Sequence, residues 1–313
     1  MTREDHTESP IVKGVFSVLA TPFHNGGEVD VASLKRYVEH FIGAGVTGFT
    51  ALGVLGEAAR LTERERALVL DTVLTQVNGR VPVVVGTTTE GLHTCLELSR
   101  AAQAAGATAV MVSPPRAPKL NSASVKAHFA ALAEALTIPI VIQDFPPVSG
   151  FAMEASLLVQ IARDIPAART IKLEDPPTPL KTARLLEAAG DVPLTIFGGL
   201  GGVYLLEELM AGSAGAMTGF AYPEILVGIV SRWHAGDRAG AADLFYKTVP
   251  LMRLEFQEGI GMAVRKEVLK RRGLITDAAT RAPGATLDAG TKAALDQLIA
   301  WTAAQEGLAW ISA

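Results

Sequence analysis

The chain has 313 residues, of which 49% are hydrophobic and 19% charged, a composition typical of a globular protein with a large core. A net charge of −4 argues against nucleic acid or an anionic membrane as a partner, and no apolar run is long enough to span a bilayer. The single cysteine, Cys95, excludes an internal disulfide and fits a reducing compartment, so we expect a cytoplasmic protein. Segment 1–10 is polar and acidic, unlike a signal peptide, and we expect it to be loosely ordered.

Short apolar runs rich in β-forming residues alternate with segments of helical spacing. The predicted strands are 15–20, 48–52, 81–86, 109–113, 138–143, 169–174, 194–197 and 216–220. The predicted helices between them are 31–42, 63–77, 93–105, 124–135, 155–163, 179–189 and 203–211. This alternation predicts a parallel sheet. Eight strands that are apolar on both faces favour closure into a (β/α)8 TIM barrel over an open sheet.

Local signals support several helix boundaries. Asp30 is placed to cap the helix that begins at 31, and Thr62 with Glu65 fits a capping box. Gly106 and Gly190 stand where helices are expected to stop.

Beyond the eighth strand the chain shows helical patterning alone. We therefore predict a barrel over residues 11–223, followed over 224–313 by the eighth helix and an appended C-terminal helical bundle packed on the barrel.

The sixth predicted strand carries a lysine inside an apolar run. Because side chains alternate along a strand, Lys172 and Glu174 share one face and Ile171 and Leu173 the other. Burial lowers the pKa of a lysine, and the neutral amine is the form that attacks a carbonyl to make a Schiff base. The alternative is a strand-end lysine that extends its head to water, with Glu174 as a surface partner.

Catalytic side chains of such barrels come from the C-terminal ends of the strands and the loops that follow. Those segments are 21–23, 53–57, 87–89, 114–116, 143–146 and 198–202. The glycine cluster at 198–202 lies where many barrels bind phosphate, but without a nearby cation we favour a tight turn that leaves space above the pocket. Gly198 and Gly199 are then expected to border the substrate.

Other catalytic patterns are absent or misplaced. The G-x-G-x-x-G match at 43–48 follows a helix and leads into a strand, the reverse of a dinucleotide fingerprint. The six histidines show no metal-ligand spacing with one another or with Cys95, and no G-x-S-x-G elbow is present. We expect neither a metal site nor a serine-hydrolase triad.

Three motifs occur in an order that identifies a family. They are the run from 14–16 through Thr21-Pro22-Phe23, the Gly53-x-x-Gly56-Glu57 motif, and Lys172. From Gly14 to the C-terminal helices, the chain resembles the dihydrodipicolinate synthase / N-acetylneuraminate lyase family. The resemblance implies a (β/α)8 barrel, usually homotetrameric, that acts on pyruvate or a related 2-oxo acid without a cofactor. It also implies that Lys172 forms the imine.

The chain departs from the family pattern around the expected substrate. Val54 and Leu55 replace two hydroxyl residues that hold the 2-oxo acid carboxylate, and Gln143 replaces the proton-shuttling tyrosine. A glutamine amide cannot give and take a proton at pH 7 as a phenol can.

Two further positions separate the chain from the synthase. Pro115 and Arg116 stand where the family has paired tyrosines, and Val148 stands where the synthase has an arginine for its second substrate. The chain therefore lacks the synthase's complete hydroxyl relay.

Glu174 is the candidate that replaces the missing acid/base, because it lies two residues beyond Lys172 on the same face. The alternative makes Glu174 a structural ion pair with a loop Arg or Lys. Gln143 is expected to orient substrate oxygens by hydrogen bonds.

The substrate carboxylate is expected at Val54, Leu55 and Gly56, with the N–H groups of Leu55 and Gly56 as a cradle. Arg116 either clamps a carboxylate by two hydrogen bonds or is a solvated loop residue.

The resulting hypothesis is a Schiff-base lyase, best described as a 2-keto-3-deoxy sugar acid dehydratase or aldolase. The first alternative is a dihydrodipicolinate synthase, which joins pyruvate to aspartate semialdehyde, with a rebuilt relay. The second is a non-catalytic protein that binds a 2-oxo acid on the same barrel.

Overall fold

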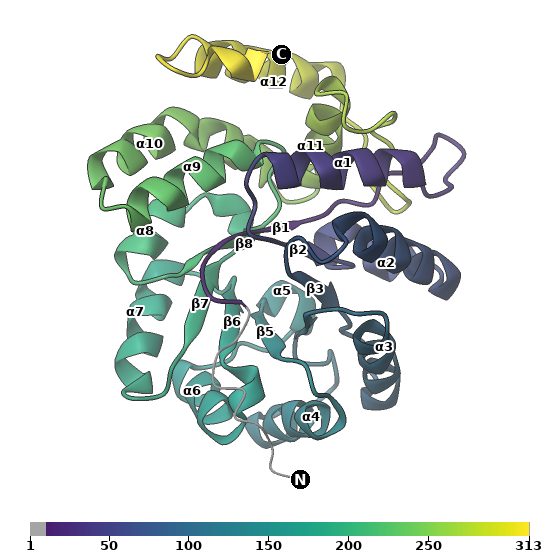
Figure 1. The fold of residues 1–313 in the computed structure, drawn as a ribbon, viewed down its shortest axis with the longest axis vertical. Coiled ribbons are helices and arrows are strands. Elements are labelled where there is room, and N and C mark those ends of the chain that lie inside the picture. The colour runs from purple at the N-terminus through teal and green to yellow at the C-terminus, as the bar shows by residue number, and fades with distance from the viewer. Residues whose placement is uncertain (1–10, 313) are drawn as a thin grey trace.

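The computed structural model describes residues 11–312, so the expectation of loose order for 1–10 lies outside the described residues. Eight parallel strands close into a barrel in chain order, with β8 returning to pair with β1, as Figure 1 shows. The strands are β1 (Gly14–Val18), β2 (Gly48–Ala51), β3 (Val83–Gly86), β4 (Ala109–Val112), β5 (Ile140–Asp144), β6 (Thr170–Leu173), β7 (Thr195–Gly198) and β8 (Gly215–Thr218). The predicted (β/α)8 barrel is confirmed.

Helices surround the barrel and extend beyond it at the C-terminal end of the chain. They are α1 (Val31–Gly43), α2 (Glu63–Val77), α3 (Leu92–Ala104), α4 (Ser122–Ala135), α5 (Pro146–Ser149), α6 (Ala155–Asp164), α7 (Thr178–Ala189), α8 (Leu205–Met210), α9 (Pro223–His234), α10 (Arg238–Glu255), α11 (Gly261–Arg271) and α12 (Ala289–Ala303). The single turn α5 was not predicted from the sequence. No helix within 11–312 is both long and apolar enough to cross a membrane.

The predicted helix starts at residues 31 and 63 are confirmed, and a capping side chain precedes each of them. The Asp30 carboxylate accepts a hydrogen bond from the Ser33 N–H at 2.9 Å, and Thr62 with Glu65 forms the full capping box. Gly190 ends α7 with a φ of 56°, in the left-handed region that glycine enters without a steric penalty.

Two predicted strands run too far toward the barrel mouth. Leu19, Ala20 and Phe220 were assigned to strands, but β1 ends at Val18 and β8 at Thr218. These three residues are buried, with exposed fractions of 3%, 1% and 2%. Hydrophobic character predicts burial, and these residues belong to the main hydrophobic core although the strands end before them.

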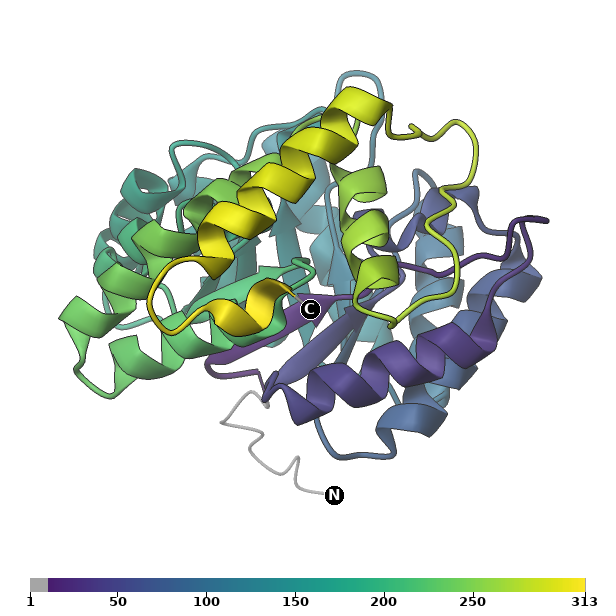
Figure 2. The same ribbon diagram turned by 90° about the horizontal axis from the view of Figure 1, so that it is seen from above.

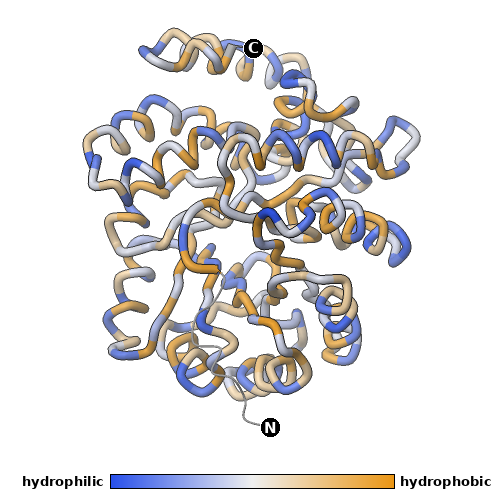
Figure 3. The backbone as a smooth tube through the Cα atoms, in the orientation of Figure 1, coloured by the Kyte–Doolittle hydropathy of each residue, from blue (hydrophilic) through white to orange (hydrophobic). Residues whose placement is uncertain are grey.

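The core has two layers, separated by the barrel wall. Inside the barrel, one cluster of buried side chains includes Phe16, Met111, Phe197 and Met217. The larger cluster fills the space between the strands and the helices. Figure 3 shows polar and apolar residues alternating along those helices, as expected where one helix face packs on the core. Because the interior is filled by side chains, a substrate can enter only at the C-terminal mouth.

The C-terminal helices build outward from one side of the barrel. Helix α9 packs against β1 and β8, α10 lies on α9, and α12 lies on α10. Helix α11 turns back toward the loops that follow β1 and β2, as the two views in Figures 1 and 2 show. The C-terminal region thus reaches the rim of the barrel mouth.

Candidate active site

Lys172 lies inside the barrel on β6, with an exposed fraction of 3%. Its neighbours in register are Gln143 on β5 and Phe197 on β7. The Nζ atom lies 3.0 Å from Oε2 of Glu174. The amine therefore does not extend to water, as the alternative for a strand-end lysine required.

Glu174 joins Lys172 to Gln143. Its Oε2 atom accepts a hydrogen bond from Nε2 of Gln143 at 2.7 Å, in addition to the contact with Lys172. The ion-pair partner is thus Lys172 itself and not an Arg or Lys of a loop. A Cβ atom at Gly199 would lie 2.3 Å from Cγ of Glu174, so the carboxylate occupies space that only glycine leaves open.

Ser113 extends this chain of contacts to a fourth residue that the sequence analysis missed. Its hydroxyl donates to Oε1 of Gln143 at 3.2 Å, while its backbone N–H donates to Oγ1 of Thr88 at 3.0 Å. Because the amide accepts only through its oxygen, this bond turns its NH2 group toward Glu174. Ser113 directly precedes the segment 114–116, so its place at a strand end was the signal available in the sequence.

The loop after β2 contains the three residues expected to hold a carboxylate. Val54 is 47% exposed, Leu55 is half-buried, and Gly56 is buried. The Gly56 N–H does not serve as expected, because it donates to the carbonyl of Gly53 at 3.0 Å. The N–H groups of Val54 and Leu55 have no hydrogen-bond acceptor within residues 11–312. A cradle in this loop would therefore use Val54 and Leu55.

Arg116 is exposed on the rim of the mouth, after the buried Pro115. Its Cγ atom lies 3.9 Å from the position a Cβ would take at Gly150. No hydrogen bond or ion pair between described residues ties Arg116 to Lys172 or Glu174. The structure does not bring this residue into the Lys172 cluster.

The glycine cluster at 198–202 permits close packing instead of leaving open space. A Cβ at Gly198 would lie 1.7 Å from Oε2 of Glu208, and one at Gly201 would lie 2.8 Å from Cβ of Phe256. The prediction of a tight turn agrees with this geometry, but the expected free space beside these residues is filled by neighbouring side chains.

Glu208 on α8 is a second buried carboxyl group near the site, and the sequence analysis missed it. It is 1% exposed, and its Oε1 accepts a hydrogen bond from the Thr178 hydroxyl at 2.5 Å. Its Oε2 has no partner among the described residues. Burial raises the pKa of Glu208 to about 8, and the nearby charge of Glu174 acts in the same direction.

A lysine on α7 holds the ends of β5 and β6 together outside the barrel. Nζ of Lys181 donates to Asp144 at 2.6 Å, to the Met153 carbonyl at 2.6 Å and to Asp175 at 2.8 Å. Burial raises the pKa of Asp144 to about 6, although Lys181 opposes the shift. Because Gln143 precedes Asp144, this contact supports the strand end that carries the amide.

Within residues 11–312, no group of three or more His, Cys, Asp or Glu side chains is arranged to hold a metal ion. The polar groups linked to Lys172 by these contacts are the Glu174 carboxylate, the Gln143 amide and the Ser113 hydroxyl. Such a set can form hydrogen bonds to substrate oxygens and can exchange one proton through the carboxylate.

Comparison with known proteins gives consistent matches along the chain. The sequence model of the dihydrodipicolinate synthetase family matches residues 11–301. An L-2-keto-3-deoxyarabonate dehydratase from Azospirillum brasilense is 33% identical over 292 residues, which are 92% of this chain and 94% of that protein. A 4-hydroxy-tetrahydrodipicolinate synthase from Methanoculleus marisnigri is 31% identical over 260 residues, 82% of this chain and 88% of that protein.

Solved structures match equally well. The crystal structure of a dihydrodipicolinate synthase from Rhodopseudomonas palustris superposes with a TM-score of 0.89 at 35% sequence identity. The match covers 94% of this chain and 99% of that structure. Both the order of the elements and their arrangement are therefore shared.

Proposed function

Because the chain belongs to the dihydrodipicolinate synthetase family, we propose that it is a class I Schiff-base lyase that dehydrates a 2-keto-3-deoxy sugar acid. The family resemblance noted in the sequence is confirmed. The observation that carries the proposal is a buried series of side-chain contacts, which links Ser113 to Gln143, Gln143 to Glu174, and Glu174 to Lys172. It provides an amine, a carboxylate beside it and an amide, but no phenol.

The proposed reaction begins with the amine of Lys172. The ammonium of Lys172 first releases a proton to solvent, and the neutral Nζ then attacks the C2 carbonyl of the substrate. The carbonyl oxygen takes up one proton from solvent as it leaves as water, and a protonated imine forms. This cation withdraws electrons from C3, so that a C3 proton becomes acidic. Glu174, 3.0 Å from Nζ, is placed to remove that proton.

The second half returns the proton. The electron pair left at C3 expels the C4 hydroxyl, which takes the proton from Glu174 and leaves as water. One water then hydrolyses the imine and frees Lys172. The net change is the loss of one water from the substrate, and the carboxylate ends in its starting state. Gln143 holds the Glu174 carboxylate within reach of the substrate's C3 and C4 by donating the 2.7 Å hydrogen bond.

Dehydration is favoured over condensation by the residues that differ from the synthase. Val54, Gln143 and Val148 stand where the synthase uses hydroxyl groups and an arginine. The similarity to an L-2-keto-3-deoxyarabonate dehydratase over 92% of this chain supports the same choice. A synthase activity remains the alternative, because other relatives carry that name.

The test is a panel of 2-keto-3-deoxy pentonates and hexonates. Mass spectrometry should detect loss of one water from at least one of them, without release of pyruvate, and Lys172→Ala should abolish it. Release of pyruvate would instead identify an aldolase. Rapid condensation of pyruvate with aspartate semialdehyde would refute the proposal in favour of the synthase.

We also propose that the protein is a homo-oligomer. Large apolar side chains are exposed at Met210 (68%), Tyr246 (63%) and Trp301 (61%), which a second copy could cover. Light scattering after size exclusion tests this, and a monomer at micromolar concentration would contradict it. The cytoplasmic location stays a prediction.

A further inference from the structure

A buried ion pair joins the loop after β2 to the C-terminal helices. Oε1 of Glu57 accepts a hydrogen bond from Nζ of Lys266 on α11 at 2.5 Å, and the two side chains are 1% and 0% exposed. Burial lowers the pKa of Lys266, although Glu57 opposes the shift. A buried ion pair is stable only where further hydrogen bonds satisfy both charged groups.

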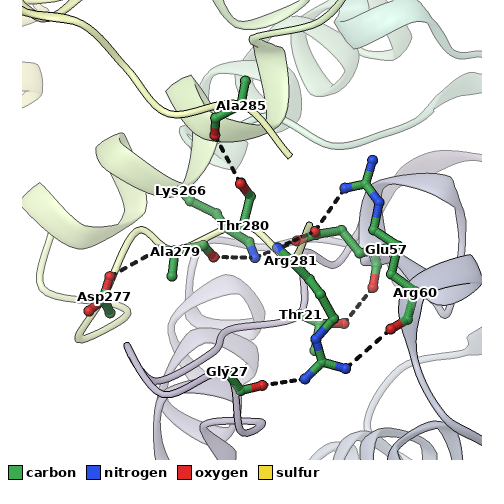
Figure 4. Close-up of polar contacts among 11 residues, drawn as sticks. Thr21, Gly27, Glu57, Arg60, Lys266, Asp277, Ala279, Thr280, Arg281 and Ala285 are labelled. Carbon is green, nitrogen blue, oxygen red and sulfur yellow. Dashed lines mark hydrogen bonds and ion pairs between the residues drawn. The ribbon is translucent and has the colours of Figure 1, made fainter. Parts of the chain in front are cut away.

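The rest of the network satisfies both charged groups. Oε2 of Glu57 accepts from the Arg60 guanidinium at 3.0 Å and from the Arg281 N–H at 2.9 Å. Lys266 donates its second hydrogen bond to the carbonyl of Ala279 at 2.8 Å. Figure 4 shows these contacts converging from the β2 loop, α11 and the segment around residue 280. Both carboxylate oxygens are engaged.

The side chain of Arg281 fastens the same segment a second time. Its guanidinium donates to both carboxylate oxygens of Glu65 at 2.7 Å each, to the Arg60 carbonyl at 3.2 Å, and to the Gly27 carbonyl. It also stacks 4.4 Å from the ring centroid of Phe23. The segment is thereby tied to the loops after both β1 and β2.

Glu57 ends the turn Val54–Gly56, where the sequence leads us to expect the substrate carboxylate. Its φ of 54° lies in the left-handed region, which is disfavoured for a residue with a Cβ. Its N–H donates to the carbonyl of Val54 at 3.0 Å, which closes the turn Val54–Gly56. The buried side-chain contacts of Glu57 therefore hold the backbone of this turn in one shape.

We infer that Glu57 and Lys266 are positioning residues through which the C-terminal helices set the geometry of the carboxylate-binding turn. The inference rests on the proposed function, because it concerns the 2-oxo acid that Lys172 attacks. Neither residue contacts the substrate; both act through the backbone N–H groups of Val54 and Leu55.

The experiment measures preference for a carboxylate during imine formation. Borohydride trapping is followed by mass spectrometry with pyruvate and with its uncharged methyl ester, at a series of concentrations. The two ketones differ in intrinsic reactivity, but that difference is the same for every variant. A change in the ratio of the two half-saturating concentrations therefore reports how well the turn binds the carboxylate.

The main variant is the double change Glu57→Gln and Lys266→Met, which removes both charges at once and leaves neither buried alone. Its half-saturating pyruvate concentration should rise by about tenfold or more, the equivalent of one hydrogen bond to a charged group. The value for the ester should stay within about twofold. If the double variant does not fold, Lys266→Met alone is read in the same way, because the Glu57 carboxylate keeps its hydrogen bonds from the Arg60 guanidinium and the Arg281 N–H.

Val268→Ala is the matched control, because Val268 is a buried residue of the same helix that contributes no charge. It should lower the melting temperature and leave the pyruvate-to-ester ratio unchanged. The inference is overturned if a folded variant of the pair keeps the wild-type ratio, or if Val268→Ala changes the ratio as strongly. Failure to trap either ketone on the wild-type protein would refute the proposed function itself, and this inference with it.

Discussion

Replacing Gly199 with alanine tests whether the position of Glu174 controls turnover. The new methyl group would lie 2.3 Å from Cγ of Glu174 and 2.7 Å from its Oε1, whereas ordinary contacts begin at 3.4 Å. The carboxylate must therefore move by about 1 Å. Its Oε2 atom is held 3.0 Å from Lys172 and 2.7 Å from Gln143, so at least one of these contacts is lost.

A misplacement of about 1 Å at a reacting group costs on the order of 10²-fold in rate, or about 2.7 kcal/mol in the activation free energy. We expect kcat on the 2-keto-3-deoxy sugar acid to fall by this factor in Gly199→Ala. Imine trapping at Lys172 should change far less, because the amine itself is not displaced. Gly91→Ala serves as the control, since its nearest contact would be the Thr94 hydroxyl at 3.8 Å.

A double-mutant cycle decides whether the effect passes through Glu174. In a Glu174→Gln background the carboxylate is already absent, so Gly199→Ala should reduce kcat little further. Equal losses in both backgrounds would refute the reasoning, because the methyl group would then act on some other part of the site.

Three further predictions follow from contacts near Lys172. Lys172→Ala should remove the borohydride adduct formed with pyruvate, and an adduct on another lysine would contradict the assignment. Ser113→Ala removes the 3.2 Å hydrogen bond to Gln143. Since such a hydrogen bond contributes about 1 kcal/mol, kcat should fall about fivefold, and Ser113→Thr should restore it. Burial raises the pKa of Glu208 to about 8, so the folded protein holds a proton that the unfolded chain releases above about pH 4.5. The free energy of unfolding should therefore fall between about pH 5 and 8, by up to about 1.4 kcal/mol per pH unit, and urea titrations should show a smaller fall in Glu208→Gln.

The sequence alone determined the barrel and the central pair of its candidate site. Strand–helix alternation predicts the fold because each element buries a face with its own period, 2 or 3.6 residues. The same period of 2 placed Lys172 and Glu174 on one face, and the structure brings their side chains to 3.0 Å. Helix starts at Asp30 and Thr62 were also predictable, since capping is settled within four residues.

Only the tertiary structure decided which distant residues complete the site. Ser113 reaches Gln143 because β4 and β5 are neighbours in the barrel, and Glu174 fits beside Gly199 because β6 and β7 are neighbours. Glu57 meets Lys266 across 209 positions of sequence. The physical reason is that local periodicity sets which face a side chain occupies, whereas strand register and helix packing set what it meets there.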